Sequence, residues 1–243
     1  MVLRDIETAD GATLPRTIDI IVPVYNEEAC VDEFVDRVTA VGLRQALMFV
    51  DNASTDLTVE RIENHAGVRL VRHDRNAGYG ASIRDGIARS GAAAIVIIDA
   101  DLEYPPESIP DLLAALDRHP VVYGSRFLGD GQPDMSWVRR CGNGLISVVF
   151  NTLFRQATTD LYTGMKALRR DALDSLTLRR DGFEHVAEMG VQLAQAGHRI
   201  YEMPVRYAPR ASGVSKMRHL RETVNYVWYI VTAWLRFRVA RRT

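Results

Sequence analysis

The sequence predicts an α/β fold: a mostly parallel β-sheet with helices on both faces. Short apolar runs of strand length recur along the chain, and segments of helical length separate them as far as about residue 127. Hydrophobic residues make up 47% of the 243 residues, which is enough for one domain with a sizeable core.

The first half of the chain alternates predicted strands with predicted helices. We expect buried strands at residues 18–24, 46–51, 67–73, 93–99 and 121–127. We expect helices at residues 27–41, 76–91 and 106–119, and a further one from about residue 57. This order is typical of strands that run parallel.

The second half is predicted to be mainly helical. The expected elements are a helix over 135–156, a strand and a helix within 163–173, a helix over 182–197 and a strand over 198–207. The stretch "PRASGVSKM" at 209–217 is expected to be a mobile loop. We therefore expect a flexible leader at 1–16, a main domain at 17–217 and an amphipathic basic helix at 218–243.

The charge of the chain is unevenly distributed. The formal net charge is −1, which gives no signal for nucleic-acid binding. Residues 206–243, however, contain nine lysines and arginines and a single acid, Glu222. A basic segment of this kind suits phosphate groups or an anionic membrane surface.

The cysteines and the N-terminus fit a protein of a reducing compartment. Cys30 and Cys141 have neither a paired nor a metal-ligand spacing, and the N-terminus lacks the apolar core of a secretory signal. No segment reaches the roughly 20 apolar residues that span a bilayer. The uncharged segments 141–154 and 223–235 have the length of a core helix or of a helix in the membrane interface, and both interpretations stay open.

Acidic residues crowd the end of one predicted strand. Asp99, Asp101 and Glu103 follow an apolar run, and they would repel one another unless a cation joined them. Hard oxygen ligands favour Mg²⁺ or Mn²⁺, and Mg²⁺ usually shares its shell with substrate phosphates. The alternative is that these side chains cap the helix that begins near residue 105.

Polar groups also follow other predicted strands. Asp51 could accept a hydrogen bond from a base or ribose and Tyr25 could stack on it, although each could be an ordinary turn residue. The turn "NAGYG" at 76–80 could offer backbone N–H groups to a phosphate. If the sheet is parallel, these strand ends share one edge, where ligands bind. The chain lacks the P-loop, G-x-G-x-x-G, H-E-x-x-H and G-x-S-x-G patterns, which disfavours the enzymes that use them.

Seven motifs in order resemble a known family. They are "IIVPVYNEE", "FVDNASTDLT", "RNAGYGASIRDGI", "VIIDADLEYPPE", "VYGSRF", "TGMKALRRDAL" and "PVRYAPRASGVSKM". Together they resemble a glycosyltransferase of family 2, in the branch that includes dolichyl-phosphate mannose synthase and bacterial polyprenyl-phosphate glycosyltransferases. The resemblance covers roughly residues 18–217 and implies the nucleotide-sugar-binding GT-A fold.

The resemblance implies roles for individual residues. Binding of the nucleotide-sugar would fall to Pro23, Tyr25, Glu27, Asp51, Asn76, Gly78, Asp99, Ala100 and Asp101. The metal ligands would be Asp99, Asp101 and Glu103. Catalysis would depend on Asp101, on Arg126 facing the phosphates, and on Arg210 and Lys216 near the acceptor phosphate.

The sequence also departs from the family pattern. Glu103 stands where many mannose synthases have glutamine, Asn52 stands where aspartate is frequent, and "TGMKAL" replaces S-G-F-R-A-L. These departures leave the donor and acceptor details open.

The resemblance implies inverting, metal-dependent transfer of a sugar from GDP-mannose or a UDP-sugar to a polyprenyl phosphate. An ionised phosphate acceptor needs no strong general base. The alternative is a soluble hydroxyl acceptor, which would need a base such as Glu184 or Glu188. A third hypothesis, a noncatalytic nucleotide-sugar-binding protein, is disfavoured by the intact Asp99, Asp101 and Arg126.

The same resemblance implies a cytoplasmic protein, peripheral on the inner face of the membrane. Trp137, Trp228 and Trp234 would lie at the interface, with or without a separate membrane subunit. Alternatively, the aromatic residues of the C-terminal helix could be buried in a homodimer.

Overall fold

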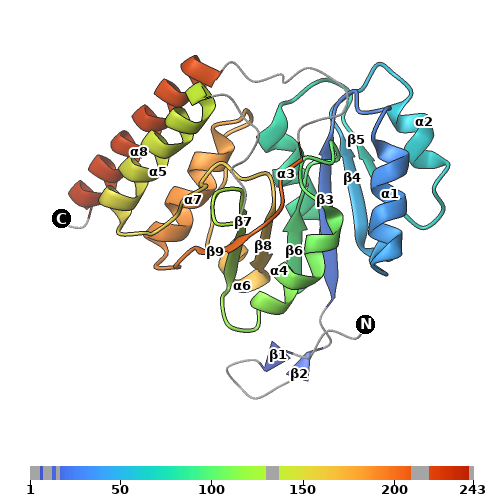
Figure 1. Ribbon diagram of the computed structural model, residues 1–243, viewed down its shortest axis with the longest axis horizontal. Coiled ribbons are helices and arrows are strands. Elements are labelled where there is room, and N and C mark those ends of the chain that lie inside the picture. The colour runs from blue at the N-terminus through green and yellow to red at the C-terminus, as the bar shows by residue number, and fades with distance from the viewer. Residues whose placement is uncertain (1–5, 8–12, 15–16, 130–136, 209–218, 241–243) are drawn as a thin grey trace.

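One mixed sheet forms the centre of the molecule (Figure 1). The computed structural model describes residues 6–7, 13–14, 17–129, 137–208 and 219–240. The strand order is β5-β4-β3-β6-β8-β7-β9. The strands are β3 (Ile18–Val24), β4 (Leu47–Asp51), β5 (Arg69–Arg72), β6 (Ala94–Ile97), β7 (Val121–Ser125), β8 (Lys166–Arg169) and β9 (Tyr201–Pro204). Strand β8 is antiparallel to β6 and β7 while the other pairs are parallel, so the predicted mostly parallel sheet is confirmed.

A separate ladder lies within the segment predicted to be a leader. Strands β1 (Ile6–Glu7) and β2 (Thr13–Leu14) pair antiparallel. Figure 1 shows this ladder apart from the main sheet. Since β3 begins at Ile18, we propose residue 17 as the start of the main domain.

Helices cover both faces of the sheet, as predicted (Figure 1). One face carries α1 (Val31–Ala40), α2 (Thr58–Glu63) and α4 (Ile109–Ala115). The other face carries α3 (Tyr79–Arg89), α5 (Trp137–Phe154), α6 (Arg170–Asp174) and α7 (His185–Gln195). The last helix, α8 (His219–Ala240), packs against α5 and α7. Two short 3₁₀ helices are η1 (Arg44–Ala46) and η2 (Pro106–Ser108).

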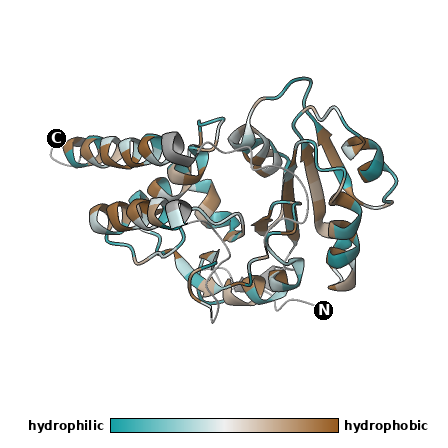
Figure 2. Ribbon diagram, turned by 45° about the horizontal axis from the view of Figure 1, so that its top comes forward, coloured by the Kyte–Doolittle hydropathy of each residue, from teal (hydrophilic) through white to brown (hydrophobic). Residues whose placement is uncertain are grey.

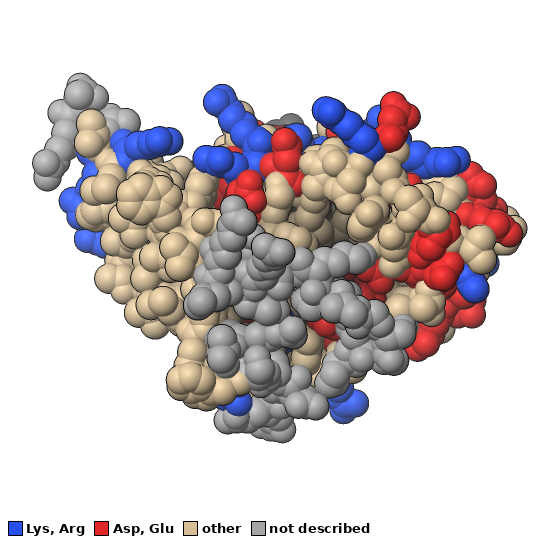
Figure 3. Space-filling model, turned by 90° about the horizontal axis from the view of Figure 1, so that it is seen from above, with Lys and Arg blue, Asp and Glu red and all other residues tan. Residues whose placement is uncertain are grey.

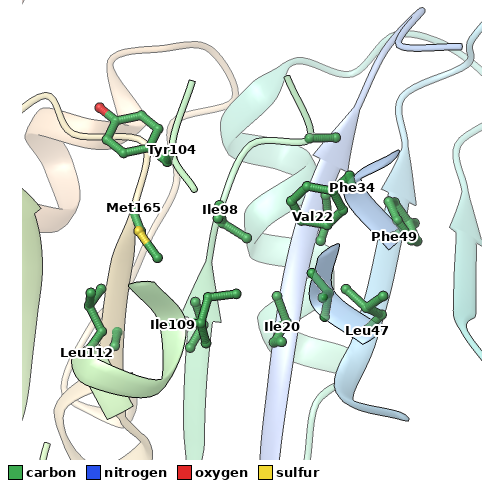
Figure 4. Close-up of a cluster of buried hydrophobic side chains, with 14 of the residues drawn as sticks. Ile20, Val22, Phe34, Leu47, Phe49, Ile98, Tyr104, Ile109, Leu112 and Met165 are labelled. Carbon is green, nitrogen blue, oxygen red and sulfur yellow. The ribbon is translucent and has the colours of Figure 1, made fainter. Parts of the chain in front are cut away.

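The core consists of two clusters, one on each face of the sheet. Successive strand residues point to opposite faces, so Ile20 and Val22 of β3 belong to one cluster and Ile21 to the other. In the cluster of Figure 4, Phe34 lies beside Phe49, and Tyr104 lies at the end of the group above Met165. Burial on both faces explains why the central strands read as continuous apolar runs.

Helix α3 packs closely onto the sheet because it contains Gly86. A Cβ added at Gly86 would lie 2.6 Å from Cγ2 of Ile21 on β3. A glycine inside a helix costs about 0.5–1 kcal/mol relative to alanine, but here it permits the close approach.

Helices α5 and α8 lie side by side at one end of the molecule (Figures 1 and 2). Each has a buried face, which includes Phe150 on α5 and Tyr226 on α8. Each also exposes an apolar stripe at helical spacing: Trp137, Leu145 and Val148 on α5, and Val224, Trp228, Leu235 and Val239 on α8. No described helix is long and apolar enough to cross a membrane.

Candidate active site

The carboxyl ends of the parallel strands surround a cleft of about 700 Å³. Most of the residues predicted to bind the donor or metal line it: Pro23, Tyr25, Glu27, Asn76, Gly78, Asp99, Ala100, Asp101, Glu103 and Arg126. Pro23 lies near the end of β3, and the other residues come from the loops that follow β3, β5, β6 and β7. The structure therefore brings distant parts of the sequence to one sheet edge, as the parallel topology requires.

Asp51 supports a loop beside the cleft instead of lining the cleft itself. Its buried carboxylate accepts the Ser54 N–H at 3.1 and 3.2 Å from its two oxygens. Its neighbour Asn52 lines the cleft, donates to Oδ1 of Asn76 at 3.0 Å and accepts the N–H of Ala77 at 2.7 Å. An ionised aspartate at position 52 could not donate to Asn76, which gives the departure from aspartate a structural reason.

The two aspartates of the D-x-D segment are held in different ways. Oδ1 of Asp99 accepts the Tyr79 hydroxyl at 3.0 Å. Oδ1 of Asp101 accepts the Glu103 N–H at 3.0 Å, across a turn in which Leu102 has a φ of 62°. The N-cap residues of η2 and α4 are Pro105 and Ser108, and neither makes a side-chain capping hydrogen bond.

These carboxylates fit a divalent cation as a partial ligand set. Across the residues that the structure describes, no group of three or more His, Cys, Asp or Glu side chains is placed to hold a metal ion. Mg²⁺ usually takes one or two protein carboxylates and completes its shell with substrate phosphates and water. Asp99 and Asp101 line the cleft and have the oxygen ligands for that arrangement. Glu103 also lines the cleft and remains a proposed ligand.

Arg126 lies in the cleft wall as half of a buried ion pair. Its Nε and Nη2 donate to Asp160 at 2.7 and 2.8 Å, and its guanidinium lies over the rings of Tyr104 and Tyr207. Burial opposes the charge of Arg126, but Tyr104 and Asp160 outweigh burial and raise the pKa of Arg126 above its usual range. Because Asp160 balances its charge, Arg126 offers the cleft mainly oriented N–H donors.

Lys166 is a second cation, buried beneath the cleft. Its Nζ donates to the backbone carbonyl of Thr163 and lies 5.2 Å from the centroid of the Tyr123 ring. Burial lowers the pKa of Lys166 to about 8, while Asp99 and Asp160 act in the opposite direction. At neutral pH its positive charge therefore offsets part of the negative charge of the site.

The segment before β8 enters the site, and sequence reasoning missed it. Strand β8 runs against its neighbours, so its beginning lies at the edge where they end. Thr163 and Gly164 therefore line the cleft. A Cβ at Gly164 would lie 2.6 Å from Oδ2 of Asp99, so glycine permits this close approach.

The backbone N–H groups at the start of α3 already donate hydrogen bonds within the chain. The N–H groups of Gly80 and Ala81 donate to the carbonyl of Asp181 at 2.7 and 3.2 Å. The N–H of Gly78 donates to the Asn76 side chain at 3.1 Å. The sequence suggested the amides of this turn for a phosphate. Instead, the Gly80 and Ala81 amides join α3 to the segment that precedes α7, and the Gly78 amide is bound within its own loop.

The far end of the cleft is apolar. Its walls come from α5, α7 and α8 and from the segments before β8 and α7. Its apolar lining includes Trp137, Leu145, Ile146, Tyr162, Phe183, Val186 and Tyr226. Trp137 is 77% exposed and also belongs to the apolar stripe of α5, so the cleft opens beside that stripe.

The candidate bases for a hydroxyl acceptor lie in a second hollow, between α7 and α8. Glu184 and Glu188 both line it. Oε2 of Glu188 accepts the N–H groups of Arg179 and Arg180 at 3.0 and 2.8 Å. Glu188 therefore holds the chain that leads into α7. Arg210 and Lys216, predicted to contact the acceptor phosphate, lie outside the described residues.

Comparison with known proteins identifies the family. The model of "Glycosyl transferase family 2" matches residues 19–177. The dolichol-phosphate mannosyltransferase of Pyrococcus furiosus is 26% identical over 211 residues, which cover 83% of this chain and 59% of that protein. The undecaprenyl-phosphate 4-deoxy-4-formamido-L-arabinose transferase of Salmonella paratyphi A is 27% identical over 232 residues, which cover 92% of this chain and 68% of that protein. The chain thus spans less than two thirds of the first relative.

Solved structures share the architecture. Glucosyl-3-phosphoglycerate synthase from Mycobacterium tuberculosis, in complex with Mn²⁺, UDP and phosphoglyceric acid, superposes with a TM-score of 0.68 at 20% identity. The superposition covers 91% of this chain and 78% of that one. This likeness confirms the predicted GT-A fold. Since the family match spans more than half of the sequence, the chain belongs to glycosyltransferase family 2 and is an enzyme of that family.

Proposed function

We propose that this enzyme transfers a sugar from GDP-mannose or a UDP-sugar to a polyprenyl phosphate. The proposal rests on the cleft, which has carboxylates at one end and an apolar lining at the other. Its carboxylate end suits a sugar diphosphate, and its apolar end lies between α5, α7 and α8. A lipid phosphate combines a charged group with a hydrocarbon chain, so it matches both ends.

At the donor end, Pro23, Tyr25 and Glu27 would contact the nucleoside. Asp99 and Asp101, with Glu103, would hold Mg²⁺ or Mn²⁺ beside the diphosphate. The cation would supply charge stabilisation for the departing nucleoside diphosphate. Arg126 would direct its remaining N–H donors toward the phosphates, since Nε and Nη2 already bind Asp160.

The chemical step needs few protein groups. An acceptor phosphate oxygen forms a bond to the anomeric carbon as the bond to the donor diphosphate breaks, and attack from the opposite side inverts that carbon. The acceptor phosphate is largely ionised near neutral pH, so no proton must be removed by a general base. Arg210 and Lys216 are our proposed contacts for this phosphate.

The exposed stripes of α5 and α8 support a position at a membrane surface. Figure 3 shows an uncharged area on the side where these helices lie, whereas acidic side chains gather at the opposite end. Arg236 and Arg238 also lie on α8, where they suit anionic head groups. The names of the two sequence relatives, which specify dolichol phosphate and undecaprenyl phosphate, agree with this proposal. We propose peripheral binding on the cytoplasmic face, alone or beside a membrane subunit.

A transfer assay tests the proposal directly. Radiolabelled GDP-mannose and UDP-sugars would be offered with Mn²⁺ to undecaprenyl phosphate in liposomes, and separately to water-soluble sugars. We expect the wild type to place label in the lipid fraction. Trp228→Ala should lose both lipid transfer and retention on liposomes. The surface control Arg118→Ala should be retained on liposomes normally. Efficient transfer to a soluble hydroxyl acceptor, with none to the lipid, would establish the alternative function.

A further inference from the structure

We infer that Tyr79 is a positioning residue that holds the Asp99 carboxylate in the orientation needed for the donor's cation. The inference rests on the donor half of the proposed function. The hydroxyl of Tyr79 donates to Oδ1 of Asp99 at 3.0 Å, and both side chains line the cleft. The sequence pattern gave Tyr79 no role, because this hydrogen bond joins residues that are 20 positions apart.

Asp99 is restrained on two sides. Tyr79 binds Oδ1, while the backbone at Gly164 approaches so closely that a Cβ there would lie 2.6 Å from Oδ2. The terminal torsion of an aspartate is otherwise broad, so these contacts reduce the range of carboxylate orientations. The carboxylate of the second aspartate, Asp101, accepts the Glu103 N–H.

Tyr79 is itself held in place by the segment before α7. Its ring stacks on Phe183, with centroids 5.3 Å apart and planes inclined by 19°. The carbonyl of Asp181 accepts N–H groups from the first turn of α3. Gly78 and Gly80 allow that approach, because a Cβ at either position would lie 2.3 Å from a backbone oxygen of this segment.

The chemistry of the pair matches the proposed role. A phenol is protonated throughout the neutral range, so the Tyr79 hydroxyl can donate to Asp99 there. Hydrogen bonds that orient metal-binding carboxylates typically change metal affinity or activity by about 10–100-fold when they are removed.

Tyr79→Phe is the sharpest test, because it removes the hydroxyl and keeps the ring on Phe183. Binding of Mn²⁺ would be measured by calorimetry in the presence of GDP or UDP, without an acceptor. We expect Mn²⁺ affinity to fall about 10-fold or more.

Tyr123→Phe is the matched control. Tyr123 is buried, its hydroxyl has no hydrogen-bond partner among the described residues, and it lies outside the cleft lining. We expect wild-type Mn²⁺ binding in this variant. Phe183→Leu, which keeps the Tyr79 hydroxyl but removes its ring partner, should weaken Mn²⁺ binding less than Tyr79→Phe, and it provides a second measurement if Tyr79→Phe folds poorly.

Unchanged Mn²⁺ affinity in folded Tyr79→Phe would overturn the inference while leaving the proposed function intact. Wild-type enzyme that binds neither nucleotide with Mn²⁺ would instead refute the donor half of the proposed function. Normal Mn²⁺ binding combined with absent lipid transfer in the wild type would refute only the proposed acceptor.

Discussion

Acidification from pH 7 to pH 5 should destabilise the fold through His185. This side chain is 1% exposed at the start of α7, and neither ring nitrogen has a hydrogen-bond partner among the described residues. Burial, with smaller contributions from Lys166 and Arg84, lowers the pKa of His185 from 6.5 to about 3. The folded protein therefore keeps this imidazole neutral at pH values where an unfolded chain protonates it.

The sign and size of the effect follow from these two pKa values. The unfolded state binds the proton first, so the stability contributed by neutral His185 is complete above pH 6.5 and is lost progressively as pH falls toward 3. Between pH 7 and pH 5 the loss amounts to about 2 kcal/mol. That is a substantial share of a typical unfolding free energy of about 5–15 kcal/mol.

Urea unfolding at pH 7 and pH 5 would measure the effect. The wild type should lose about 2 kcal/mol more than His185→Leu between the two pH values, because leucine does not titrate. Val191, which is 1% exposed on the same helix, provides a control. Val191→Ala leaves a cavity and should be less stable than the wild type by a similar amount at both pH values. If the wild type and His185→Leu lose the same free energy, His185 is not held neutral and the reasoning is refuted.

Three further substitutions test other parts of the structure. Asp160→Asn leaves Arg126 buried without its charged partner, so we expect a loss of about 3–5 kcal/mol in urea unfolding and a reduced kcat; unchanged values of both would contradict the ion-pair role. Gly86→Ala introduces a contact of 2.6 Å with Ile21 and should cost about 1–3 kcal/mol, whereas a higher Tm would show that α3 shifts freely. Asp101→Ala should abolish transfer and Mn²⁺-dependent nucleotide binding with the circular dichroism spectrum preserved, and normal turnover at saturating Mn²⁺ would count against its metal role.

The fold was largely predictable because periodicity reports local burial. Strands such as β3 and β4 are buried on both sides, and their apolar runs are visible in the sequence. Their carboxyl ends, including Tyr25 and the loop after Asp51, could then be assigned to one edge from the parallel topology alone. Element ends were less predictable: the strand expected over 198–207 is limited in the structure to Tyr201–Pro204.

Partners that are distant in the sequence were not predictable in the same way. The strand within 163–173 was expected, but nothing in its pattern showed that β8 is antiparallel, so the segment containing Asp160 was not placed near Arg126. The first turn of α3 suggested a phosphate site because its acceptor, the carbonyl of Asp181, lies about 100 residues further along the chain. Local patterns identify exposed donors and acceptors, whereas tertiary structure determines which of them meet.

The apolar stripes on α5 and α8 have a consequence for handling the purified enzyme. In plain buffer, two copies can remove these side chains from water by associating through them, since large exposed apolar patches favour contact. Oligomers formed in this way should dissociate when detergent micelles offer an alternative cover. A dimer that persists in micelles would have to be held together elsewhere, and only that dimer would bear on the enzyme's assembly in the cell.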